Sequence, residues 1–149
     1  MLFEIKLYRI QSEAGRYFLH EHPASASSWR LPEMQSLMAD LGIKKVNAHM
    51  CRFKMKSKDE QGEGLVKKPT GFLTNSDHLR QALDKQCLGG HRHVHLMSGR
   101  AKACQVDPES LVRAILNGIR LELVNNGMLN MLHHYMLNVD AEDSAMEEF

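Results

Sequence analysis

The fold class is indicated by residues 32–53, which read PEMQSLMADLGIKKVNAHMCRF. Pro32 suits the first turn of a helix and Gly42 suits its end, and an apolar stripe lies between them, formed by Leu37, Met38 and Leu41. From residue 43 to residue 53 apolar side chains alternate with polar ones, which is the period of a strand. A helix that leads directly into a strand predicts an α/β fold.

The rest of the chain continues this alternation. Helices are predicted over residues 2–14, for about ten residues after Ser76, and over 107–127. A short buried strand is predicted near residues 17–20, a charged surface loop over 54–64, and a strand pair or kinked strand from 65–66 and 71–74. We therefore expect a small central sheet flanked by helices.

Length and composition favour one soluble domain. The 149 residues carry a net charge of +1, and 43% of them are hydrophobic. We expect a single α/β domain over 1–139 and an acidic, disordered tail over 140–149. Three unevenly spaced cysteines favour a reducing compartment over a disulfide scaffold. No apolar run approaches the ~20 residues of a membrane helix, so we expect an intracellular protein of the nucleus or cytoplasm.

One short window concentrates metal-binding side chains. Cys87, His91 and His93 lie within seven residues, and thiolate sulfur and imidazole nitrogen are ligands that zinc prefers. A structural zinc site needs a fourth ligand, which the sequence leaves open between Cys51 and Cys104. The alternative is that the histidines are partly exposed polar residues and that Cys87 is a small core residue.

The middle of the chain is basic and suggests an anionic partner. The candidate contacts to nucleic-acid phosphate are Lys67, Lys68, Arg92 and Arg100. Charge runs of this kind are also common on solvated surfaces. Cys51 has Arg52 beside it, which could lower its pKa and make it a nucleophile, although a buried structural cysteine is the alternative interpretation.

Several of these motifs form an ordered pattern over residues 8–120. It comprises Phe18-Leu19-His20-Glu21-His22-Pro23, Ser28-Trp29, Leu31-Pro32, Cys51-Arg52-Phe53, Lys68-Pro69-Thr70-Gly71-Phe72-Leu73-Thr74-Asn75, Cys87 and Gly90-His91-Arg92-His93. The pattern resembles a domain found in polyproteins of Copia-type retrotransposons and in uncharacterised proteins of dinoflagellates and other microbial eukaryotes. The resemblance implies a nucleic-acid-associated domain, with other parts of a larger polyprotein as partners.

That domain is in turn similar to the distal part of cytosine-5 DNA methyltransferases. The similarity implies that Glu21 matches the acidic residue that holds the target base, and that Cys51 belongs to the Cys-x-Tyr/Phe-Gly element. His22 stands where those enzymes have Asn, and Lys54 stands where they have Gly. The methyl-donor loop and the Pro-Cys nucleophile motif of such enzymes are not in this sequence, so S-adenosylmethionine would require a missing half.

Three functional hypotheses follow. The first is a nucleic-acid-associated domain or remnant of a retrotransposon-type polyprotein of a mobile element, without catalysis on its own. The second is the distal part of a DNA cytosine methyltransferase-like enzyme, with an incomplete Rossmann-like half. The third is a zinc-stabilised interaction module without a nucleic-acid role.

Overall fold

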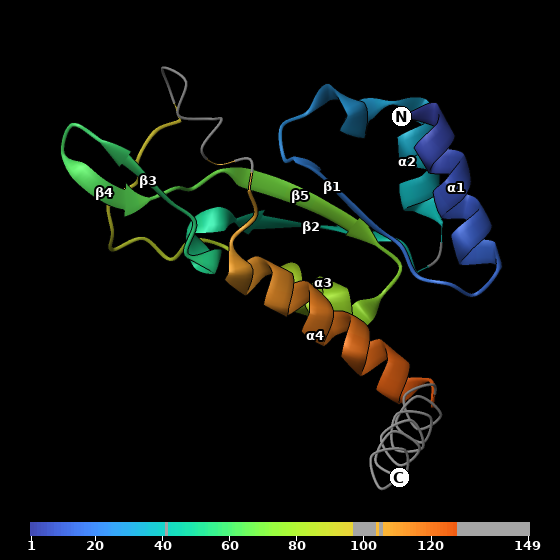
Figure 1. Cartoon of the computed structure of the whole chain (residues 1–149). Helices are drawn as coiled ribbons and strands as arrows, with labels where there is room; N and C mark the ends of the chain where they lie inside the picture. Colours follow the sequence, from blue (N-terminus) through green and yellow to red (C-terminus); the bar gives the residue numbers. More distant parts are fainter. Residues whose placement is uncertain (41, 97–103, 105, 128–149) are drawn as a thin grey trace, which may run out of the picture.

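The computed structural model describes residues 1–40, 42–96, 104 and 106–127, and its centre is a three-stranded sheet (Figure 1). The strands run in the order β1 (Leu19–Pro23), β5 (Pro69–Thr74), β2 (Lys44–His49). Both pairings are antiparallel. The predicted α/β fold with a small central sheet and flanking helices is confirmed. The Rossmann-like half is not confirmed, because that fold uses mostly parallel strands.

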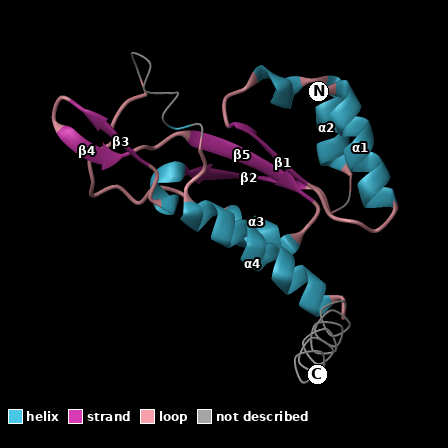
Figure 2. Cartoon of the chain, in the orientation of Figure 1, coloured by secondary structure: helices cyan, strands magenta, loops and turns pink. Residues whose placement is uncertain are grey.

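Helices cover both faces of this sheet (Figure 2). Helices α1 (Leu2–Glu13) and α2 (Pro32–Ala39) lie on one face, and α3 (Asp77–Leu83) and α4 (Glu109–Asn125) lie on the other. Because side chains alternate along β5, Leu73 joins the apolar cluster beneath α1 and α2, whereas Phe72 joins the cluster on the other face. The central strand is therefore buried on both faces.

Gly71 allows a close approach at the middle of β5. A Cβ atom at this position would lie 2.8 Å from the indole Cζ2 of Trp29 and 2.8 Å from Cε of Lys45. The Lys45 ammonium in turn lies 4.4 Å from the centre of a Trp29 ring, within the range of a cation–π contact. The sheet at this point needs a residue without a side chain, since Trp29 occupies the space above the backbone.

Two sequence interpretations of the middle segment are wrong. Residues 54–64 were expected to form a loop, but they contain most of a hairpin of β3 (Lys56–Asp59) and β4 (Gly62–Leu65). Residues 65–66 and 71–74 were expected to form a strand pair or one kinked strand. Instead Leu65 ends β4, and the later residues belong to the central strand. The charged alternation of β3 hid the hairpin, because neither of its faces is apolar.

The remaining elements agree with the sequence apart from their ends. Strand β2 ends at His49, and a 3₁₀-helix, η2 (Met50–Phe53), replaces the last predicted strand residues. A second 3₁₀-helix, η1 (Ser27–Arg30), was not predicted. None of the helices over the described ranges is long and apolar enough to cross a membrane. The tail predicted over 140–149 lies outside the described residues.

His20 is a buried histidine with an incomplete set of partners. Its Nδ1 lies 3.0 Å from the Tyr8 hydroxyl, while its Nε2 is buried without a hydrogen-bond partner among the described residues. Burial lowers the pKa of His20, and the neighbouring His22 lowers this pKa further. The fold therefore favours the neutral imidazole.

This site predicts a loss of stability in mild acid. Because the pKa of His20 is lower in the folded state, the unfolded chain binds the proton first, below about pH 6.5. Stability should therefore fall as the pH decreases from there through the folded-state pKa. Urea unfolding at pH 7.5 and pH 5.5 measures this loss, which should be smaller in His20→Phe. The control His95→Ala, at an exposed position, should keep the full loss.

Candidate metal centre

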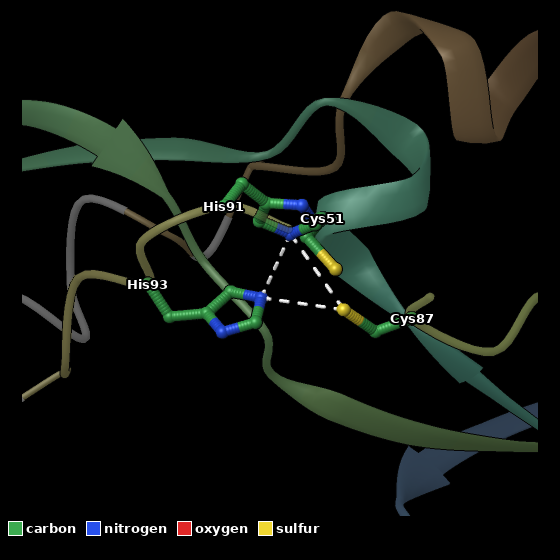
Figure 3. Close-up of side chains that lie close together, drawn as sticks. All are labelled: Cys51, Cys87, His91 and His93. Carbon is green, nitrogen blue, oxygen red and sulfur yellow. Dashed lines mark hydrogen bonds between the residues drawn. The ribbon is translucent and has the colours of Figure 1, made fainter. Parts of the chain in front are cut away.

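Four side chains with metal-binding atoms converge beyond the end of β2 (Figure 3). They are the thiols of Cys51 and Cys87 and the imidazoles of His91 and His93, and their ligand atoms all lie within 4.8 Å of one another. The sequence left the fourth ligand open between two cysteines, and the structure brings Cys51 to this place. Cys104 instead lies in the core, with Sγ 4.0 Å from the carbonyl oxygen of Lys56.

The spacing of the ligand atoms fits a tetrahedral zinc ion. The Cys87 Sγ lies 3.6 Å from Nε2 of His91 and 3.6 Å from Nε2 of His93, and the two nitrogens are 3.0 Å apart. Tetrahedral zinc with its usual bond lengths would separate sulfur from nitrogen by about 3.6 Å and two nitrogens by about 3.3 Å. The Cys87 sulfur and the two Nε2 atoms are therefore already close to the positions that the ion requires, and the Cys51 thiol lies within 4.8 Å of the other ligand atoms.

Cys51 is held in place by the short helix η2. The Met50 N–H donates to the Lys67 carbonyl at 2.6 Å, which fixes the start of η2 against the segment that leads into β5. Lys54 ends η2 in the left-handed conformation, with φ of 60°, and its N–H donates to the Cys51 carbonyl. Met50 and Phe53 are both buried. Cys51 is thus a well-anchored candidate ligand, with 5% of its surface exposed.

A double-glycine turn returns the chain from Cys87 to His91. Gly89 and Gly90 both adopt positive φ, 79° and 75°, which glycine adopts at little cost. The Gly89 N–H also points at the Cys87 Sγ, at 3.4 Å. This backbone hydrogen bond is the main cause that lowers the pKa of the Cys87 thiol, and the charges of Lys67 and Arg52 add to it. The turn therefore favours the thiolate that a metal needs.

Arg92, between the two candidate histidine ligands, is anchored on the β3–β4 hairpin. Its guanidinium pairs with the Asp59 carboxylate at 2.7 Å and donates to the carbonyls of Gly62 and Glu63 at 3.1 and 3.2 Å. The side chain of Arg92 is thus fixed on the β3–β4 hairpin, while His91 and His93 turn toward the thiols. Arg92 was expected to contact phosphate, but in the structure its guanidinium binds groups of the protein itself.

Further bonds tie the segment before Cys87 to the end of β2. The Cys87 N–H donates to Nδ1 of His49 at 2.8 Å, and the His49 N–H donates to the Lys85 carbonyl at 3.0 Å. Arg52 donates to the Gln86 carbonyl at 3.1 Å.

Burial raises the pKa of the Cys51 thiol, and the nearby Cys87 raises it further. Of the two thiols, Cys87 therefore loses its proton more readily.

The two residues that the methyltransferase similarity made catalytic candidates are not brought together. Glu21 is exposed on β1, opposite Phe72 of the central strand. Cys51 follows β2, which pairs with the other edge of that strand. The group around Cys51 does not include Glu21.

Of the predicted phosphate contacts, Lys67 and Lys68 lie beside the metal group, and Arg100 lies outside the described residues.

Fold and donor set together define an α/β domain with a candidate Cys₂His₂ metal centre. No protein-family model matches the chain, and no curated protein or solved structure is significantly similar to it. A functional proposal must therefore start from the site itself.

Proposed function

We propose that the chain is a zinc-stabilised module whose metal holds the 87–93 segment against the end of the central sheet. The observation that carries this proposal is the convergence of two thiols and two imidazoles, three of which already have the spacing of tetrahedral ligands. Sulfur ligands with imidazoles select zinc over magnesium, calcium or manganese, which prefer oxygen. Zinc would link Cys51 of η2 to ligands from a loop that has no regular secondary structure of its own.

The donor set supports a structural rather than a catalytic metal. Catalytic zinc sites commonly have three protein ligands and leave the fourth position to water or substrate, whereas structural sites use four protein ligands. Here four side chains are available, and Cys51 is buried. The same four residues belong to the retrotransposon-type sequence pattern. We therefore propose that this pattern describes a metal-holding domain of a polyprotein, in preference to a methyltransferase half.

Metal analysis of the purified protein tests this proposal. We expect about one zinc per chain in the wild type and little zinc in His91→Ala, because three ligands bind zinc far more weakly than four. The matched control is His95→Ala, since both histidines are exposed and lie in the same segment. Cobalt added to the metal-free protein should give a thiolate-to-metal absorption band that Cys87→Ser weakens. Equal zinc contents in His91→Ala and in the wild type would contradict the proposed site.

A further inference from the structure

A pocket of about 630 Å³ lies directly beside the metal group. It is formed by two segments, residues 66–69, which lead into the central strand and include its first residue, and residues 93–96, which begin at the candidate ligand His93. His93 belongs both to the pocket wall and to the metal group. The two segments are joined by the Val94 N–H, which donates to the Leu65 carbonyl at 2.7 Å. The volume is in the usual range for small-molecule sites.

One side of this pocket is cationic. Lys67 is exposed and Lys68 is half-buried, and none of the described residues that line the pocket is acidic. Within the described residues, neither lysine has an ion pair with a carboxylate. Lys67 is close enough to His49 and His93 to lower the pKa of both imidazoles, after the larger effect of their burial. Among the described residues, therefore, no carboxylate pairs with this positive charge.

The backbone holds Lys68 in an uncommon conformation. Its φ is 28°, in the left-handed region that residues with a side chain seldom adopt. Its ammonium donates to the Cys104 carbonyl at 3.2 Å, which uses one of three N–H groups and leaves two. Such conformations cost free energy and are concentrated at binding sites. The position of this lysine is therefore set by the fold.

The other walls are apolar. Val66 and Val94 are buried beneath the pocket, Leu96 is half-buried, and Pro69 and His95 are exposed at its edge. An imidazole offers a flat surface on which an unstacked base can lie, a proline ring offers an apolar one, and histidine is one of the side chains that stack on bases in RNA complexes. Two cations beside an apolar wall match the two parts of a nucleotide.

We infer that this pocket binds one nucleotide of a single-stranded nucleic acid. Lys67 and Lys68 contact its phosphate, and the base lies against Pro69, His95 and Leu96. A duplex does not fit this arrangement, because its bases are stacked and paired inside the helix. The inference rests on the proposed function in one respect, since the metal fixes the 93–96 wall through His93. In this inference Arg92 no longer contacts phosphate, because its guanidinium already pairs with Asp59 of the hairpin.

Fluorescence anisotropy with labelled oligonucleotides tests the pocket. Zinc-loaded protein is titrated with single-stranded DNA, single-stranded RNA and the matching DNA duplex at several salt concentrations. We expect the single strands to bind more tightly than the duplex. Each neutralised phosphate contributes a slope of about −0.7 to log K against log salt, so Lys67→Ala should weaken binding and reduce the slope by about 0.7.

The control variant is Lys44→Ala, which removes the same charge elsewhere. Lys44 is exposed on β2 and pairs with Thr74, at the opposite end of β5 from Pro69. Lys44→Ala should bind like the wild type. Equal weakening by both variants, or equal binding of duplex and single strands, would overturn the inference. His95→Ala should weaken binding without changing the salt slope, because it removes a stacking surface and no permanent charge.

Zinc is measured in the same samples, so that the two proposals can fail separately. Zinc-loaded wild type without binding to any single strand rejects the pocket and leaves the metal proposal intact. Wild type that holds no zinc rejects the proposed function, and the Lys67→Ala comparison on that protein still decides the pocket. Binding that differs between the DNA and RNA strands identifies which of the two sugars the site accepts.

Discussion

Chelation of zinc should release the 85–96 segment while the central sheet stays folded. Apart from the candidate metal ligands, this segment is held by the Arg92 contacts to the hairpin, by buried Val94 and by a few hydrogen bonds near its ends. These bonds join Cys87 and Lys85 to His49, Gln86 to Arg52, and Val94 to Leu65. The sheet has its own apolar clusters on both faces. A ligand present at 1,000 times its Kd stabilises a fold by about 4 kcal/mol, so tightly bound zinc should contribute at least this much.

Hydrogen exchange with and without chelator measures the effect locally, and thermal unfolding measures it globally. Amides of residues 85–95 should exchange much faster without metal, whereas those of β5 should remain protected. His91→Ala should behave like the chelated wild type and should not respond to chelator, while His95→Ala should respond fully. Unchanged protection of the loop after verified zinc removal would show that the metal does not hold it.

The site could be predicted only as far as its ligands are local in sequence. Cys87, His91 and His93 share one window, so their spacing alone indicated chelation. The fourth candidate ligand, Cys51, lies in the short helix η2 that follows β2, much earlier in the chain, and its position depends on how β2 pairs with β5. No spacing rule contains that pairing. The role of Arg92 was hidden for the same reason, because its partners lie on a hairpin that the sequence did not predict.

The fold shows the same limit. Helix α4 falls within the range predicted for a helix, 107–127, yet its apolar residues Val112, Leu116 and Ile119 are exposed. The face that packs against α3 contains Gly118, where a Cβ atom would lie 2.9 Å from Cδ2 of Leu79 and 3.1 Å from its Cα. The two helices are so close at this point that only glycine fits, and a large apolar residue does not. A hydrophobicity pattern cannot reveal a contact that depends on a missing side chain.

Glu122 lies on the same buried face and caps the neighbouring helix. One carboxylate oxygen accepts from the Ser76 hydroxyl at 2.5 Å and from the His78 N–H at 3.1 Å, while the Ser76 oxygen accepts from the Leu79 N–H at 3.0 Å. Burial by itself would raise the pKa of this carboxyl, but the hydrogen bonds from Ser76, His78 and Tyr17 outweigh burial and lower it. The charged form therefore stabilises the start of α3.

Glu122→Ala should be strongly destabilising, because it leaves the Ser76 hydroxyl and the His78 N–H without their acceptor. Each unsatisfied buried group costs roughly 1–3 kcal/mol, so we expect a loss of about 3 kcal/mol in urea unfolding at pH 7. Glu109→Ala is the control on the same helix. Its ion pair with Arg113 is exposed, and such pairs contribute at most about 1 kcal/mol.

The dependence on pH separates the loss of the carboxylate from a loss of packing. The pKa of Glu122 is lower in the folded state, so its contribution is complete above the unfolded value of about 4.3 and is lost as the pH falls through the folded-state value. The stability difference between wild type and Glu122→Gln should therefore shrink in acid. Zinc bound at the proposed site would be lost alike from both proteins in acid, and this loss would cancel in the comparison. A difference that stays constant from pH 7 down to pH 3 would mean that shape, and not charge, holds the two helices together.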